Sequence, residues 1–85
     1  MNTVIWTKDS CDFCVKAKSM LTSKGIEFEE RNLSSNVWNK EQLLEAAPTA
    51  KTVPQIWLYG KYVGGHDNLC RYFDDHNMWT GDCEL

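Results

Sequence analysis

The stretch that decides how this chain folds is VIWTKDSCDFCVKAKSML, residues 4–21. An apolar run over 3–7 predicts a short buried strand, and apolar side chains at three- and four-residue spacings after residue 12 predict an amphipathic helix that ends at Gly25. Cys11 and Cys14 stand where strand gives way to helix, so the positive end of the helix dipole favours a thiolate at Cys11. Cys14 follows one turn later, where it can close a disulfide. The pattern is typical of a dithiol redox site, although zinc sites use the same spacing.

The rest of the chain predicts further strands and helices around this unit. Residues 26–31, 55–59 and 61–63 read as strands, with Gly60-Lys61 as a two-residue hairpin turn. Helices are predicted over 37–47 and 67–76. The order β-α-β-α-β-β-α belongs to the α/β class and predicts a four-stranded mixed sheet with three helices, in which the first βαβ unit forms a parallel pair.

Length and composition limit the remaining possibilities. The 85 residues are interpreted as a single domain, with a core over about 2–76 and a patternless tail over 77–85. A composition of 42% hydrophobic and 25% charged residues excludes a disordered chain. The net charge of −3, without runs of Lys or Arg, argues against nucleic-acid binding.

The chain also lacks the signals of secretion and membrane insertion. Its first residues have no basic segment followed by an apolar core, and no stretch approaches the roughly 20 apolar residues of a membrane span. We therefore expect a cytoplasmic protein without a membrane partner. In that compartment four cysteines indicate redox or metal chemistry rather than a secreted disulfide scaffold.

Three motifs in order carry a family resemblance: the CxxC at 11–14, Thr52-Val53-Pro54 before the third strand, and Gly64-Gly65-His66-Asp67 before the last helix. Over residues 2 to about 76 the chain resembles the glutaredoxin family. The resemblance implies a thioredoxin-like fold, a monomer, and a glutathione-dependent oxidoreductase that reduces protein disulfides and glutathionyl mixed disulfides. Disulfide-containing client proteins are implied as partners, with ribonucleotide reductase a plausible client by family analogy.

The resemblance also implies roles for individual residues. Cys11 is the expected nucleophile and Cys14 the resolving thiol, unless Cys14 is only a helix-core cysteine. The expected glutathione-binding residues are Lys8, Phe13, Thr52, Val53, Pro54, Gly65, His66 and Asp67. In the family the proline is cis and the residue before it pairs with the ligand backbone, whereas the alternative here is a trans proline that starts an edge strand. Lys8 is alternatively a solvated surface residue, and Asp67 alternatively serves only as a helix N-cap.

Some features of the chain depart from the family. Asp12 stands where the commonest dithiol motif has proline. Cys70 and Cys83 are interpreted as incidental, with the formation of mixed disulfides as the alternative. A redoxin of the same fold that is reduced by thioredoxin reductase, and an iron–sulfur carrier ligated by Cys11 and glutathione, remain as alternative functions. A zinc site is disfavoured because Cys70 and Cys83 do not form a second CxxC pair, and we expect no metal.

Overall fold

A computed structural model describes residues 2–74 and 81–85 of the chain. Within them a four-stranded sheet has the order β2-β1-β4-β5, built from β1 (Val4–Thr7), β2 (Glu29–Asn32), β4 (Gln55–Leu58) and β5 (Lys61–Gly64). Strand β1 runs parallel to β2 and antiparallel to β4, and β4 runs antiparallel to β5. The predicted mixed sheet and its parallel βαβ pair are confirmed.

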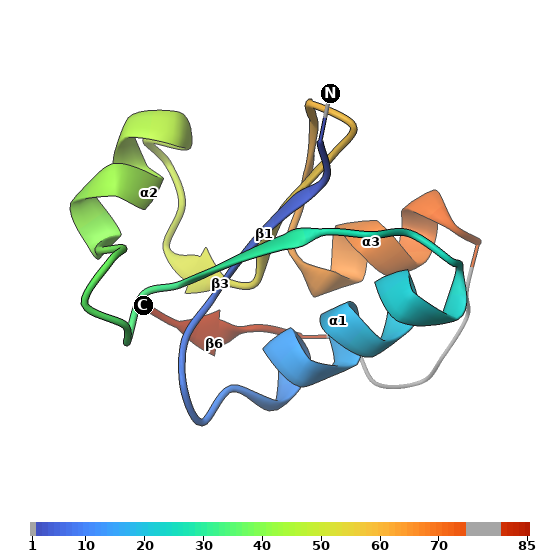
Figure 1. Cartoon of the computed structure of the whole chain (residues 1–85), viewed down its shortest axis with the longest axis horizontal. Coiled ribbons are helices and arrows are strands. Elements are labelled where there is room, and N and C mark those ends of the chain that lie inside the picture. Colours follow the sequence, from blue (N-terminus) through green and yellow to red (C-terminus); the bar gives the residue numbers. More distant parts are fainter. Residues whose placement is uncertain (1, 75–80) are drawn as a thin grey trace.

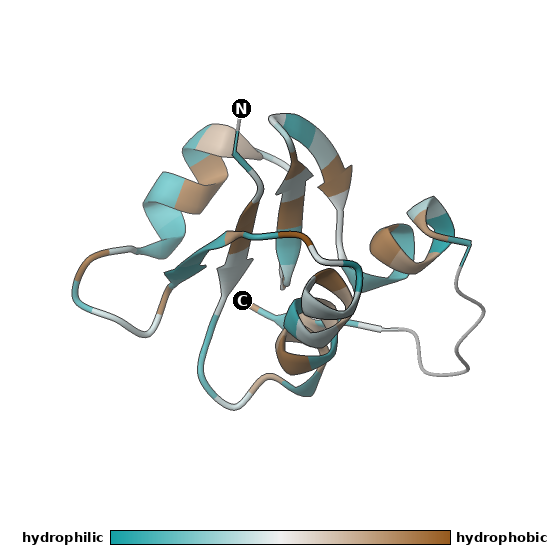
Figure 2. Ribbon diagram, turned by 45° about the vertical axis from the view of Figure 1, so that its right-hand side comes forward, coloured by the Kyte–Doolittle hydropathy of each residue, from teal (hydrophilic) through white to brown (hydrophobic). Residues whose placement is uncertain are grey.

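Helices cover both faces of this sheet (Figures 1 and 2). Helices α1 (Asp12–Ser23) and α3 (His66–Tyr72) lie side by side against one face, and α2 (Lys40–Ala46) lies on the other. Side chains alternate along the strands, so Ile5 faces α1 and α3 while Trp6 faces α2. None of the helices described is long and apolar enough to cross a bilayer.

Two apolar clusters form the core, one on each face. The cluster under α1 and α3 contains Ile5, Ala17, Met20, Leu21, Ile56, Leu58, Leu69 and Cys70. The cluster under α2 contains Trp6, Cys11, Cys14, Leu43, Ala47, Ala50 and Val53. Both cysteines of the CxxC motif therefore belong to the core on the α2 side.

The start of one helix, the end of another and the position of the hairpin turn differ from their predicted positions. The helix predicted over 37–47 begins only at Lys40, because Asn39 caps it and forms a reciprocal capping box with Gln42. The hairpin turn consists of Tyr59 and Gly60, with φ of 50° and 85°, which is the two-residue geometry that favours glycine at its second position. The last predicted helix ends at Tyr72, and residues 75 and 76 of that prediction lie outside the described part.

A second, two-stranded sheet was not predicted. Strand β3 (Thr52–Val53) pairs antiparallel with β6 (Cys83–Glu84), with Thr52 opposite Glu84 and Val53 opposite Cys83. Figure 1 shows β6 lying beside β3, near the start of α1. The tail thus contains a strand at Cys83–Glu84 that the sequence did not indicate, whereas residues 77–80 lie outside the described residues.

Candidate active site

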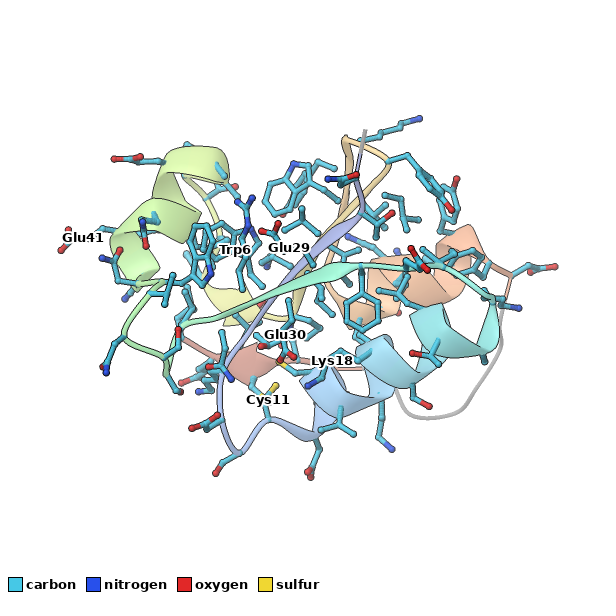
Figure 3. The ribbon with its side chains drawn as sticks, viewed as in Figure 1. Trp6, Cys11, Lys18, Glu29, Glu30 and Glu41 are labelled. Carbon is cyan, nitrogen blue, oxygen red and sulfur yellow. The ribbon has the colours of Figure 1, made fainter. Side chains whose placement is uncertain are left out.

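Cys11 occupies the N-cap position of α1. Its backbone is extended, with φ −119° and ψ 101°, and its sulfur accepts a hydrogen bond from the Cys14 backbone N–H at 3.2 Å. The Cys11 thiol also contacts the Val53 carbonyl oxygen, with the sulfur 3.8 Å from that acceptor. Figure 3 shows the Cys11 side chain at the start of α1, directed towards β6. The sulfur therefore lies between a helix N-terminus and the backbone of a strand.

Cys14 lies one turn further along α1, and its side chain is buried. All four cysteines are free thiols, so the chain is described in its reduced state. Burial raises the pKa of Cys14, and hydrogen bonds from the Cys11 side chain and the Lys8 backbone oppose that rise. The direction of this shift favours a protonated thiol at Cys14.

Burial opposes the thiolate that was expected at Cys11. Cys11 is only 3% exposed, and burial raises its pKa above the ordinary thiol value. The Cys14 backbone N–H and the Cys83 side chain lower the pKa, but they do not outweigh burial. The helix terminus acts as predicted, whereas the desolvation of Cys11 was not foreseen.

Val53 and Pro54 form the wall opposite Cys11. The peptide bond between them is cis, as the family resemblance implied, and Val53 is fully buried. The Gln55 side-chain amide donates to the Thr52 carbonyl at 2.9 Å, which holds the backbone of β3 in place. Thr52, Val53 and Pro54 are thus brought next to the CxxC motif.

Lys8 lies beside the same wall and is half-buried. Its ammonium group donates a hydrogen bond to the Glu84 carbonyl oxygen of β6. The charge of Lys8 also lowers the pKa of Cys83, although burial raises that pKa more strongly. Lys8 therefore lies beside β6, and its role in ligand binding stays a prediction.

The Gly64-Gly65-His66-Asp67 motif forms the start of α3. Gly65 is the N-cap, and a Cβ added there would lie 3.4 Å from the Pro54 carbonyl oxygen. His66 is buried, and its ring packs against Phe13 with the ring centroids 5.6 Å apart. The structure therefore brings Gly65, His66 and Phe13 to one side of the thiols.

Asp67 lies at the outer edge of this group. It is the second residue of α3 rather than its cap, and its carboxylate pairs with Arg71 at 3.0 Å. The alternative that Asp67 serves as the helix N-cap is therefore wrong. Its side chain is 45% exposed, so its charge remains accessible to a ligand.

Residues 81–85 also contribute to the site, which was not predicted from the sequence. Cys83 faces Val53 across the small sheet, and the Phe13 backbone N–H lowers its pKa by hydrogen bonding. The pair of strands is too short to produce a periodic pattern, and the one available signal was a further cysteine two residues after a glycine. Among residues 2–74 and 81–85, no group of three or more His, Cys, Asp or Glu side chains is arranged to hold a metal ion.

This fold and this pair of thiols define a thiol–disulfide oxidoreductase of the thioredoxin-like class. Residues 3–63 match the glutaredoxin family. Glutaredoxin 3 of Escherichia coli strain K12 is 37% identical over 68 residues, which cover 80% of this chain and 81% of that protein. The chain therefore belongs to the glutaredoxin family.

Solved structures of the family have the same fold. The solution structure of glutaredoxin from Brucella melitensis superposes with a TM-score of 0.70 at 31% identity, covering 88% of this chain and 80% of that one. A crystal structure of wheat glutaredoxin superposes with a TM-score of 0.75 at 28% identity, covering 86% of this chain and 73% of that one.

Proposed function

We propose that this chain reduces protein disulfides and glutathionyl mixed disulfides with electrons from glutathione. The observation that carries the proposal is the position of Cys11. Its sulfur caps α1, accepts the Cys14 N–H at 3.2 Å, and lies 3.8 Å from the Val53 carbonyl on the edge of β3. A substrate sulfur delivered along that edge arrives next to both thiols.

The reaction is an exchange of disulfide bonds. The Cys11 thiolate attacks one sulfur of the substrate disulfide, a mixed disulfide forms, and the other substrate sulfur leaves as a thiolate that takes up a proton. Cys14 then attacks the Cys11 sulfur and releases the remaining substrate thiol, or a glutathione thiolate resolves the intermediate instead. Backbone N–H groups at the start of α1 stabilise the negative charge on Cys11 when it attacks as a thiolate and when it leaves as one.

Glutathione is proposed to bind as a short extended strand along β3, in the way that peptides add to a sheet edge, and this requires β6 to leave that edge. Thr52, Val53 and Pro54 provide the backbone wall, and Phe13, Gly65 and His66 provide the side of the site near α3. Lys8 and Asp67 carry opposite charges at separate positions around the thiols, which suits a ligand with a carboxylate at one end and an ammonium group at the other.

A coupled assay tests the proposal directly. Reduction of a small glutathionyl mixed disulfide is followed with glutathione, glutathione reductase and NADPH. We expect Cys11→Ser to lose activity and Cys14→Ser to retain it. Activity that needs thioredoxin reductase in place of glutathione would instead support the alternative redoxin, and visible absorbance of the purified protein would support the iron–sulfur carrier.

The cellular setting forms part of the same proposal. Reduced thiols persist in the cytoplasm, so we place a monomeric protein there, with disulfide-containing proteins as clients and ribonucleotide reductase as the first client to assay. Cell fractionation and gel filtration test the location and the monomer, and reduction of oxidised ribonucleotide reductase tests the client.

A further inference from the structure

Residues 81–85, referred to below as the docked segment, lie on the edge of β3 next to the active-site thiols. Cys83 stands opposite Val53 in the antiparallel pair, and the Leu85 N–H donates to the Lys51 carbonyl at 3.1 Å. Because Val53 also contacts the Cys11 thiol through its carbonyl oxygen, the segment carries a third sulfur to the place where Cys11 lies. Cys83 packs on the same apolar cluster as Cys11 and Cys14.

Other contacts hold the docked segment at both ends. Lys8 donates to the Glu84 carbonyl, and the Asp82 carboxylate lies 3.9 Å from the position of a Cβ at Gly65. Gly81 is packed so closely on the Phe13 ring that a Cβ would lie 2.8 Å from the ring. The segment thus runs from the start of α3 to Lys8, past Cys11.

We propose that Cys83 is a third redox thiol, which the docked segment positions to form a disulfide with Cys11. The segment occupies the β3 edge as an extended peptide substrate would, with its cysteine in the place of the substrate sulfur. The segment and glutathione would then compete for the same edge of β3, and this part of the proposal rests on the proposed function. The Cys11–Cys83 disulfide does not rest on it.

Cys83 would act by thiol–disulfide exchange, which needs only thiols and disulfides. After Cys11 has formed a mixed disulfide with a substrate, the Cys83 thiolate attacks the Cys11 sulfur and the bond to the substrate breaks. The substrate leaves as a thiolate and takes up a proton. Two electrons pass from Cys11 and Cys83 to the original substrate disulfide, and two equivalents of a small thiol such as glutathione restore both cysteines.

Docking of the segment and release of the substrate are coupled in this scheme. Within the described residues β3 pairs with β6 alone, and its two residues offer a single short ladder for an extended chain. When the segment returns to β3, it displaces the substrate backbone at the same time as Cys83 displaces the substrate sulfur. Cys83 is half-exposed while Cys14 is only 1% exposed, so Cys83 is the more accessible resolving thiol.

Disulfide mapping of the full chain tests the proposal. The Cys14→Ser variant is reduced, freed of reductant, oxidised with diamide in the absence of glutathione, alkylated, and digested under non-reducing conditions for mass spectrometry. We expect Cys11 linked to Cys83 as the main product. Cys14→Ser/Cys83→Ser should form no intramolecular disulfide with Cys11, and the matched control Cys14→Ser/Cys70→Ser should give the same product as its parent.

A parallel oxidation in concentrated urea separates docking from chance pairing. Cys70 is much nearer to Cys83 in sequence than Cys11 is, so loop-closure entropy favours the Cys70–Cys83 disulfide in the unfolded chain. A change from Cys70–Cys83 in urea to Cys11–Cys83 in buffer supports the proposal. Disulfide-linked dimers, Cys11 paired with Cys70, or the same pairing in both conditions would overturn it. Because no glutathione is present, these outcomes are independent of the coupled assay.

Discussion

Alanine at Gly81 tests whether the docked segment covers Cys11 in solution. Gly81 has φ of +153°, and its added Cβ would lie 2.8 Å from Cζ of Phe13, where ordinary van der Waals contact begins at 3.4 Å. The added Cβ would therefore lie closer to Cζ than ordinary contact allows, so either the segment or the ring must move. The unfavourable contact exists only while the segment is docked, and the substitution therefore shifts the equilibrium towards release.

The size of the effect follows from the cost of overpacking. Extra atoms in a closely packed site cost typically about 1–3 kcal/mol. If about 1–2 kcal/mol of this destabilises the docked state, the ratio of docked to released segment falls roughly five- to thirtyfold. Cys11 is only 3% exposed. If the segment provides this cover, a reagent reaches Cys11 mainly after release. Its alkylation should accelerate by up to the same factor.

Iodoacetamide alkylation of Cys11, measured by mass spectrometry in a Cys14→Ser background, provides the assay. The matched control is Gly25→Ala, because Gly25 also has a positive φ of 72° but has nothing within 4 Å of its added Cβ. The control should lower the melting temperature without accelerating alkylation. Equal rates in Gly81→Ala and Gly25→Ala would refute the reasoning, and so would slower alkylation in Gly81→Ala.

The other predictions concern the thiols and the charges around them. In the coupled assay, Cys11→Ser should abolish all activity. Cys14→Ser should keep both deglutathionylation and the reduction of protein disulfides, whereas Cys14→Ser/Cys83→Ser should lose the reduction of protein disulfides; full activity of that double variant would contradict both resolving roles. Asp67→Ala should weaken glutathione binding in calorimetric titrations by less than the roughly 1–3 kcal/mol of a buried charge-assisted contact, because the carboxylate is 45% exposed; unchanged affinity would remove Asp67 from the site. Burial raises the pKa of the three thiols at the site above the ordinary value of 9.0. Above that pH the folded chain keeps protons that the unfolded chain loses, so the free energy of unfolding in urea should fall as the pH rises past 9.0. A free energy of unfolding that does not change with pH would contradict the raised pKa values. Asp12→Pro should lower the pKa of Cys11 by removing a like charge, with an effect that shrinks on adding salt; thiolate absorbance across pH measures it, and a raised pKa would show that Asp12 acts mainly as a helix-stabilising group.

The sequence predicted the parts of the fold that depend on periodicity and on strong local signals. The apolar strand before Cys11 and the helix after it are present, because the same residues satisfy both the local pattern and the core. The hairpin was predicted one residue late, since the sequence did not reveal that Tyr59 would accept a positive φ. The start of α2 was placed early because the Asn39–Gln42 capping box was not recognised.

The sequence motifs predicted which residues lie near the thiols, but they did not predict the direction of the Cys11 pKa shift. The three motifs lie close together as the family resemblance implied: the Cys11 thiol contacts the Val53 carbonyl oxygen, and Gly65 packs against the Pro54 carbonyl oxygen. The pKa of Cys11 depends instead on how deeply the sulfur is buried and on the hydrogen bonds it makes, one of which is with Cys83. A two-residue strand has no period and forms only against a particular partner, so neither the strand nor its effect on Cys11 was visible in the sequence.

The pairing of β3 with β6 also bears on how the molecule meets other molecules. An unpaired strand edge displays N–H and C=O groups that can recruit a strand from another chain, and proteins commonly protect such edges. Here the chain covers the edge with its own residues, and the Leu85 N–H satisfies the Lys51 carbonyl. A strand from any other protein must first replace these hydrogen bonds. The same holds for a second copy of this chain, so self-association through β3 requires β6 to leave the edge beside Cys11.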